Sequence, residues 1–200
     1  TRFFQPLGMR ETRYNSDTLK AGDNVATGHA KADFTTLQPA PRMTWRNVAG
    51  AGGIYSSVSD MAKWMNAQLA GGTYRDANGR EQALFTPARQ KAMWSLVTPS
   101  PIAEPKIDAL KAAKPNFLGY GEGWMVSDFQ GSKLVWHTGG WPGMVSRVTL
   151  VPEQKLGIVV LTNQEVGAAF NAVTMKVLDA YLANSGTDWA SPAVGADAAT

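Results

Sequence analysis

The residues best suited to chemistry in this chain form the run His137-Thr138-Gly139-Gly140, which leads into a Trp-Pro-Gly turn. The imidazole of His137 can take or give a proton near neutral pH. On an extended strand His137 and Gly139 share one face, because successive side chains alternate between faces. A glycine inside a strand adds no packing of its own, so it indicates a place where something else approaches the backbone closely.

Spacing alone leaves two interpretations of this run open. In the first, a substrate lies along the strand as an added strand does, and the Gly140 N–H supplies one donor of an oxyanion hole. In the second, Gly139 and Gly140 begin a bulge or turn into Trp141-Pro142-Gly143, and His137 is hydrogen-bonded and inert. The neighbouring elements must position the run in either case.

The period of the hydrophobic pattern predicts four strands around this run, at 117–129, 133–139, 144–152 and 155–163. Their joins are short, which indicates antiparallel neighbours. The last strand is almost wholly apolar, as expected for a strand covered on both faces. A helix over 164–183 follows, and its apolar stripe should lie across the sheet. The stripe consists of Val166, Phe170, Val173, Val177 and Tyr181.

Helices are predicted before the strands. Ser57 with Asp60 three residues later resembles a capping box, and Gly71 ends the periodic run that follows. Thr86 and Pro87 open a second short helix that extends to residue 94. The first 48 residues read as a loop-rich excursion, and the segment 97–116 reads as an insertion with one or two helical turns.

These elements predict one α+β unit over residues 1–184, followed by a loose tail at 185–200. The start of the chain reads as the end of a helix followed by a turn. We expect Tyr120 and Trp124 in the sheet core. His29 is interpreted as an ordinary loop histidine.

Composition excludes several classes of function. Lysine and arginine are scattered and the net charge is only +3, so no basic footprint for nucleic acid is present. The chain has no cysteine, which excludes disulfides and thiolate metal sites. Its two histidines are far apart in the sequence, so we expect neither a metal site nor a cofactor. No apolar run approaches the roughly 20 residues of a membrane-spanning helix.

The run at 137–140, followed by two apolar strands, resembles the third active-site motif of the serine β-lactamase and penicillin-binding-protein superfamily. The branch it resembles is that of class C β-lactamases and related esterases and aminopeptidases. In this family the motif is Lys-Thr-Gly or His-Thr-Gly. Three further stretches resemble family segments in the family's order: "PLGMRETRY" at 6–14, "AGGIYSSVSDMAKWM" at 51–65 and "GYGEGWMV" at 119–126.

The resemblance implies a role for each residue of the run. His137 would face the nucleophile and assist proton movement. Thr138 and Gly139 would lie along the substrate, and Gly140 would supply one oxyanion-hole N–H. Trp141 would form one wall of the cleft, or would serve only as a packed turn residue. The fold implied is β-lactamase/transpeptidase-like, an antiparallel sheet with the C-terminal helix packed on it and a helical region beside it.

Two family motifs are not found in these 200 residues. No serine has lysine three positions later, and no tyrosine has asparagine two positions later. The Ser-x-x-Lys pair supplies the family's nucleophile and its activating amine. Both motifs precede, in the family, the segment that resembles residues 6–14. We therefore expect the C-terminal part of a serine hydrolase that hydrolyses an ester, peptide or β-lactam through an acyl-enzyme, inactive on its own.

A second hypothesis stays open beside the enzyme. The chain could be a non-catalytic module that recognises cell-wall peptide or a protein partner. The expected ligand of the enzyme is a small-molecule or peptide acyl compound. An open sheet edge predicts self-association or a missing N-terminal fragment. The resemblance favours a periplasmic or secreted protein.

Overall fold

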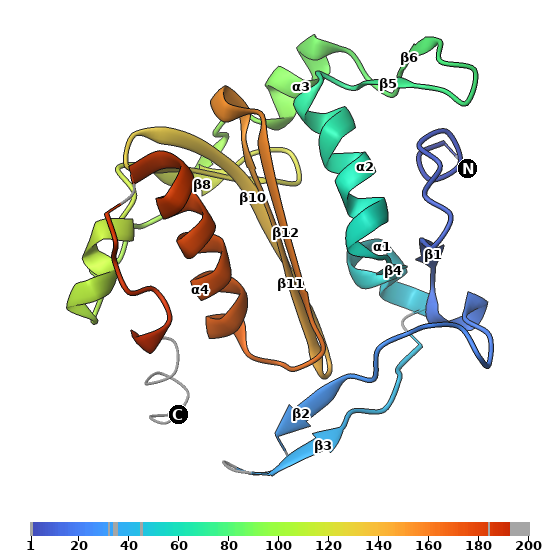
Figure 1. Cartoon of the computed structure of the whole chain (residues 1–200), viewed down its shortest axis with the longest axis horizontal. Helices are drawn as coiled ribbons and strands as arrows, with labels where there is room; N and C mark the ends of the chain where they lie inside the picture. The colour runs from blue at the N-terminus through green and yellow to red at the C-terminus, as the bar shows by residue number, and fades with distance from the viewer. Residues whose placement is uncertain (1, 32, 34–35, 45, 184, 193–200) are drawn as a thin grey trace.

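The computed structural model describes residues 2–31, 33, 36–44, 46–183 and 185–192. Its centre is a six-stranded antiparallel sheet in the order β12-β11-β10-β9-β8-β7. Figure 1 shows helix α2 on one side of the long strands and helix α4 on the other. The strands of this sheet are β7 (Thr98–Pro99), β8 (Leu118–Tyr120), β9 (Met125–Phe129), β10 (Ser132–Trp141), β11 (Met144–Val151) and β12 (Leu156–Thr162).

Shorter elements surround the sheet, and three two-stranded pairs are formed by β1 with β4, β2 with β3, and β5 with β6. These strands are β1 (Arg13–Tyr14), β2 (His29–Lys31), β3 (Leu37–Pro39), β4 (Ile54–Tyr55), β5 (Thr73–Arg75) and β6 (Glu81–Ala83). The α-helices are α1 (Ala49–Gly52), α2 (Val58–Leu69), α3 (Pro87–Met93) and α4 (Gly167–Leu178). Short 3-10 helices are η1 (Ser16–Thr18), η2 (Arg46–Val48), η3 (Asp108–Ala113) and η4 (Pro152–Gln154).

The sheet buries a separate core on each face, because successive strand residues point to opposite sides. Leu134 packs into the core beneath α4, whereas the next residue, Val135, packs into the core beneath α2. The core beneath α4 contains Phe129, Leu134, Val151, Ile158, Leu178 and Trp189. The core beneath α2 contains Met65, Trp94, Trp124, Val135 and Leu150.

Helix α2 begins where the capping pattern predicts. The Ser57 side chain accepts a hydrogen bond from the Asp60 N–H, and Gly71, with φ 73°, follows the last turn. Helix α3 likewise starts after Thr86, whose side chain accepts from the Arg89 N–H. Both caps satisfy N–H groups that a helix leaves without partners in its first turn.

The Asp60 carboxylate fastens the N-terminal segment to α2. It is buried and accepts hydrogen bonds from the Glu11 N–H at 2.8 Å and the Thr12 hydroxyl at 2.9 Å. Lys63 lies 2.7 Å from its other oxygen. Burial by itself would raise the pKa of Asp60, but these hydrogen bonds outweigh it and hold the pKa below its usual value. Residues 4–8 form hydrogen-bonded turns and not the helix end that was expected there, and Gly8 at φ 64° closes these turns.

A second polar contact joins the sheet to α4. The Arg147 side chain of β11 is buried over the Trp136 ring, 4.3 Å from its centroid. It donates to the Thr149 hydroxyl at 3.1 Å and to the Asn171 side-chain oxygen at 2.5 Å. Burial lowers the pKa of Arg147 to about 10, and the guanidinium still keeps its proton at neutral pH.

The single strand predicted over 117–129 is wrong in one respect, because the chain turns back inside it. Strands β8 and β9 pair antiparallel with each other, with Tyr120 opposite Met125. Gly123 adopts φ 78° in the turn. A Cβ on Gly121 would lie 2.4 Å from the Met93 carbonyl oxygen, so only glycine fits this close approach.

The stripe predicted for the last helix is confirmed only in part, because Phe170 is buried and Val177 packs against the core beneath α4. Within the stripe Val173 is 50% exposed and Tyr181 is 68% exposed, while Val166 only precedes the helix. The fully buried positions of the helix are Phe170, Thr174 and Leu178. The Thr174 hydroxyl donates to the Phe170 carbonyl at 2.7 Å, which lets a polar residue face the sheet. After Leu178 the helix widens into one π-turn, η5 (Asp179–Ala183).

The last described residues differ from the loose tail expected over 185–200. Trp189 is only 2% exposed, and its ring lies edge-on to Phe129 at a centroid distance of 6.0 Å. Ser185 donates from both its N–H and its hydroxyl to the Asp179 carboxylate. Trp189 therefore anchors this segment on the core beneath α4, while most of residues 185–192 are exposed. The remainder of that prediction, 193–200, falls outside the described residues.

Candidate active site

Strand β10 has two halves with different neighbours. Residues 132–136 pair with β9 on one side, and the last pair in that register is Trp136 with Met125. On its other side β10 pairs with β11 from Val135 to Trp141 without a break. The motif run at 137–140 therefore lies in the half of the strand that extends beyond β9.

The register determines where the backbone groups of this half point. Trp141 and Met144 flank a two-residue turn. In such a hairpin the two flanking residues form a hydrogen-bonded pair, in which each N–H donates to the carbonyl oxygen of the other residue. Such pairs alternate along an antiparallel ladder, which makes Gly139 a bonded partner of β11. Thr138 and Gly140 then direct their N–H and C=O groups away from β11, toward the side that β9 leaves open.

Gly140 lies on the open edge of β10. It is exposed, and a Cβ built on it would meet nothing within 4 Å. Among the described residues, no acceptor takes its N–H. The uninterrupted register excludes the bulge that was one sequence interpretation, since the turn begins only after Trp141. An unpaired N–H on an exposed strand edge is suited to a developing negative charge on an acyl oxygen.

Gly139 lies opposite a hydroxyl group that could not be inferred from spacing in the sequence. A Cβ on this residue would lie 2.6 Å from the Ser146 hydroxyl oxygen, which comes from the opposite position on β11. The space left by the missing side chain therefore accommodates a hydroxyl on the same face as His137. Sequence reasoning missed Ser146, because its position opposite a glycine follows from register alone.

The His137 ring is half-buried and is held at both nitrogens. Its Nδ1 lies 2.6 Å from the carbonyl oxygen of Thr138, and its Nε2 lies 3.0 Å from the Tyr120 hydroxyl. The Tyr120 ring is 36% exposed and sits edge-on to the imidazole at a centroid distance of 5.8 Å. The prediction that Tyr120 lies in the sheet core is wrong, because the residue reaches the histidine around the end of β9.

Trp124, by contrast, is in the core as predicted. It is 5% exposed and stacks on Trp64 of α2, with ring centroids 5.4 Å apart. The two aromatic residues of the segment at 119–126 therefore have different roles. Trp124 holds α2 against the sheet, and Tyr120 contacts the motif.

Trp141 connects the open end of β10 to the segment at 51–65. Its ring lies edge-on to Tyr55 at 5.9 Å, and it packs 3.8 Å from where a Cβ of Gly52 would lie. Burial raises the pKa of Tyr55, and the charge of Arg42 opposes that rise. The Trp141 side chain thus packs on α1 and β4 beside the motif, an arrangement consistent with both roles considered from sequence.

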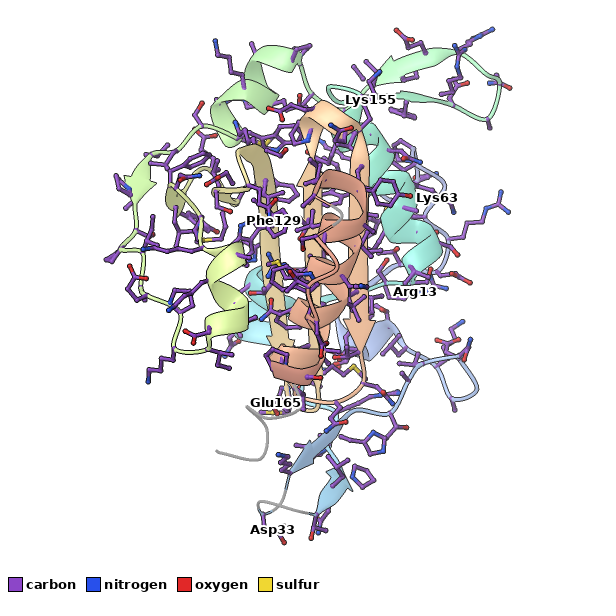
Figure 2. All side chains as sticks on the ribbon, turned by 60° about the vertical axis from the view of Figure 1, so that its left-hand side comes forward. Arg13, Asp33, Lys63, Phe129, Lys155 and Glu165 are labelled. Carbon is purple, nitrogen blue, oxygen red and sulfur yellow. The ribbon has the colours of Figure 1, made fainter. Side chains whose placement is uncertain are left out.

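The turn after the motif is anchored by backbone contacts. The His29 N–H lies 2.9 Å from the carbonyl oxygens of both Gly143 and Asn163, and the Gly143 N–H donates to the Glu165 carboxylate at 3.2 Å. Figure 2 shows Glu165 at one end of β12 and Lys155 at the other, so this anchoring is confined to the motif end of the sheet. The His29 ring also contacts this region, because its Nδ1 lies 3.2 Å from the Asn163 carbonyl oxygen. His29 opens strand β2, so its interpretation as an ordinary loop histidine is wrong.

Neither a cluster of candidate metal ligands nor a membrane-spanning helix is found in the described part of the chain. In the described ranges, no group of three or more His, Asp or Glu side chains is placed to hold a metal ion. No helix in the same ranges is long and apolar enough to cross a membrane.

Comparison with curated proteins shows the family of the chain. The family model described as Beta-lactamase matches residues 1–182. An unguisins hydrolase, ungD', from Aspergillus campestris is 30% identical over 163 residues, which cover 80% of this chain and 27% of that protein. D-alanyl-D-alanine-carboxypeptidase/endopeptidase AmpH from Escherichia coli K12 is 21% identical over 182 residues, covering 91% of this chain and 43% of that protein.

Solved structures share the fold. The octameric penicillin-binding protein homologue from Pyrococcus abyssi superposes with a TM-score of 0.68 at 23% identity, covering 90% of this chain and 36% of that one. The D-amino acid amidase from Ochrobactrum anthropi SV3 gives a TM-score of 0.59 at 19% identity, covering 98% and 49%. The chain spans less than half of the length of each of these four relatives. Because the family model covers most of its residues, this chain belongs to the beta-lactamase family.

Proposed function

We propose that these residues form the His-Thr-Gly wall of the active site of a serine hydrolase that works through an acyl-enzyme. The Gly140 N–H supplies one oxyanion donor, and Thr138 and Gly139 lie along the acyl group. His137 assists proton movement at the reacting centre, and Trp141 closes the side of the cleft. The nucleophile and its activating lysine come from a Ser-x-x-Lys segment outside these 200 residues.

The observation that carries this proposal is the open edge of β10 beside Thr138 and Gly140. An extended acyl compound can add to this edge as a strand would, through the N–H and C=O groups that point away from β11. Its carbonyl oxygen then meets the Gly140 N–H, which has no acceptor among the described residues. A strand that served only to close the sheet would have no reason to extend beyond its neighbour.

The substrate class we favour is an amide or peptide. The relatives include a carboxypeptidase/endopeptidase, a D-amino acid amidase and a D-stereospecific amidohydrolase, all named for cleavage of amide bonds. Binding along a strand edge also suits a peptide, because main-chain groups pair with main-chain groups. Esters and β-lactams present the same acyl carbonyl to the same donor and are suitable probes.

A binding module remains the second candidate, and one observation favours it. The 200 residues contain the strand edge but no Ser-x-x-Lys. Such a module would hold a peptide on β10 and release it unchanged.

Labelling of the protein that carries these residues, with a fluorescent penicillin or a p-nitrophenyl ester, separates the two candidates. The enzyme should form a covalent acyl adduct, and His137→Ala should slow acylation by about 10²-fold or more, the low end of what proton transfer contributes. His29→Ala removes the other imidazole of the chain and keeps the backbone contacts of His29 to the turn, so it is the matched control and should label at nearly the wild-type rate. Binding without any covalent adduct would favour the module. Equal acylation by His137→Ala and wild type would refute the role of His137.

We also propose that the outer edge of β12 is covered in the functional protein. Among the described strands β12 pairs only with β11, and Leu161 on it is 40% exposed. An uncovered strand edge invites pairing with another chain. A second copy or a further segment of the protein would satisfy it, and one solved relative is octameric. Sedimentation that shows a stable monomer of 21.5 kDa with no second polypeptide would contradict this proposal.

A further inference from the structure

The Tyr120 hydroxyl and the His137 imidazole form a pair built across the end of β9. Tyr120 is opposite Met125, and Met125 is opposite Trp136, the residue before the histidine. Directly opposite residues share a face of a sheet, so by register Tyr120 should lie on the face of Trp136 and not on that of His137. The phenol lies 3.0 Å from Nε2, beside the part of β10 that β9 does not flank because β9 begins only at Met125.

The contacts of the ring determine which nitrogen carries the proton. A carbonyl oxygen can only accept, so the Nδ1 that lies 2.6 Å from the Thr138 oxygen must be the N–H of the neutral ring. A neutral imidazole has one N–H, which leaves Nε2 with a lone pair. The Tyr120 O–H therefore donates to Nε2 when His137 is neutral.

A hydroxyl also fits the protonated ring without any movement. When His137 carries both protons, each nitrogen is a donor, and the Tyr120 oxygen turns from donor to acceptor by rotation of its O–H bond. A carboxylate in this position would fit only the charged ring, and an ammonium group only the neutral one. The pair thus lets His137 gain and lose a proton while its orientation stays fixed.

We propose that Tyr120 is a positioning residue for His137, holding the imidazole in the Nδ1–H tautomer with Nε2 directed to the phenol. This inference rests on the proposed function, because the positioned ring matters only if it takes part in acyl transfer. Both nitrogens of the His137 ring already have hydrogen-bond partners. The Tyr120 hydroxyl, in contrast, can still form a further hydrogen bond. Its partial exposure places that capacity at the mouth of the site.

The pairing itself is tested by ¹⁵N NMR of the imidazoles in the 200-residue chain, which requires no activity. The wild type should show His137 as the Nδ1–H tautomer. Tyr120→Phe keeps the ring and removes only the hydroxyl, so the His137 Nε2 resonance should shift and the Nε2–H tautomer should appear. His29, the second histidine of the chain, is an internal reference. Tyr181→Phe, at a residue that is 68% exposed, is the matched control and should change neither ring.

A second variant tests the pair from the other side and does not depend on how Tyr120→Phe folds. His137→Phe removes the acceptor of the phenol, so the ¹³Cζ resonance of Tyr120 should shift while that of Tyr181 should not. An unchanged Tyr120 resonance, or a wild-type His137 that carries its proton on Nε2, would overturn the pairing.

The consequence for the reaction is tested with the protein that carries the nucleophile. Tyr120→Phe should lower kcat roughly 10- to 100-fold, part of the 10²–10⁴ that a positioned acid or base supplies, with KM nearly unchanged. A change in KM alone would assign Tyr120 to substrate binding and overturn the positioning role, as would a wild-type kcat. If the wild type itself forms no acyl adduct, the proposed function fails, and the NMR result still decides whether Tyr120 positions the ring.

Discussion

The two halves of β10 are built from one continuous strand and have opposite properties. In the first half Leu134 and Val135 are 2% and 0% exposed, with a neighbouring strand on each side. In the second half Thr138, Gly139 and Gly140 are all exposed, with only β11 beside them. The difference comes from β9, which begins at Met125 and therefore flanks only the first half. A strand that extends beyond its neighbour therefore presents backbone groups that have no partner strand on that side.

The same contrast explains why the motif needs support from outside the sheet. The open half has no β9 ladder to hold it, and other contacts replace that ladder. Tyr120 holds the histidine, Trp141 packs on α1 and β4, and the backbone of His29 anchors the turn. Side-chain and loop contacts thus position the site where strand pairing ends.

The largest expected effect is the difference in stability loss between a substitution in the closed half of β10 and one in the open half. Leu134→Ala should lower the free energy of unfolding by about 2–5 kcal/mol, because it opens a cavity in the core beneath α4. Thr138→Ala, on the exposed half, should change it by about 0.5 kcal/mol or less. Urea unfolding followed by tryptophan fluorescence measures both. Equal losses would mean that the open half is as tightly packed as the closed half.

A pair of proline substitutions separates the two glycines of the motif. Gly140→Pro removes an N–H that has no acceptor in the described chain, so the fold should remain while acylation falls by about 10²–10³-fold, the cost of one oxyanion donor. Gly139→Pro removes an N–H that bonds to β11 and also places a Cβ 2.6 Å from the Ser146 hydroxyl oxygen, so it should cost at least about 1–3 kcal/mol of stability. Fluorescent-penicillin labelling and thermal unfolding measure the two effects. The reverse pattern would mean that Gly140 bonds to β11 and Gly139 faces the open side.

A smaller effect concerns Asp128, which fixes the turn of the closed half. Its buried carboxylate accepts from Asn116, Phe117 and Gly131. Burial alone would raise its pKa, but these hydrogen bonds prevail and hold the pKa below its usual value of 3.8. The stabilisation is therefore complete above pH 3.8 and is lost as the pH falls through the lower, folded pKa.

Asp128→Asn should cost roughly 1–3 kcal/mol at neutral pH, because an amide nitrogen then faces N–H donors. The loss of stability on acidification should become shallower in this variant. Unfolding curves measured from neutral pH down to strongly acidic pH test this change. An acid profile identical to that of the wild type would show that Asp128 does not contribute to acid sensitivity.

Much of the fold could be predicted because local rules agree with the tertiary structure. Ser57 and Thr86 cap their helices, and the short joins after β9 and β11 gave the antiparallel order. The turn inside 117–129 was missed because the strand was predicted to continue through Gly121 and Gly123, where the chain turns back. The face of α4 was predicted only in part because Thr174 is polar by type and becomes compatible with the core only through its hydrogen bond to the helix backbone.

The motif run could be recognised in the sequence, but the residues that surround it could not. The His-Thr-Gly-Gly run indicated an unusual strand from its residue types alone. Tyr120 was assigned to the core because an aromatic residue in a strand usually packs there, and no spacing reveals a partner 17 positions away. Ser146 became visible only once the register placed it opposite Gly139. The sequence did not reveal that β9 begins only at Met125, because this boundary depends on the turn between β8 and β9.

Residue-by-residue amide hydrogen exchange along β10 tests the open strand edge most directly, because it reads out which N–H groups are bonded. We predict slow exchange at His137, Gly139 and Trp141, which bond to β11, and fast exchange at Thr138 and Gly140, which face the open side. Addition of a peptide that binds this edge should slow those two amides selectively. A Gly140 amide already as protected as that of Gly139 in the free protein would contradict the assignment of Gly140 as an oxyanion donor.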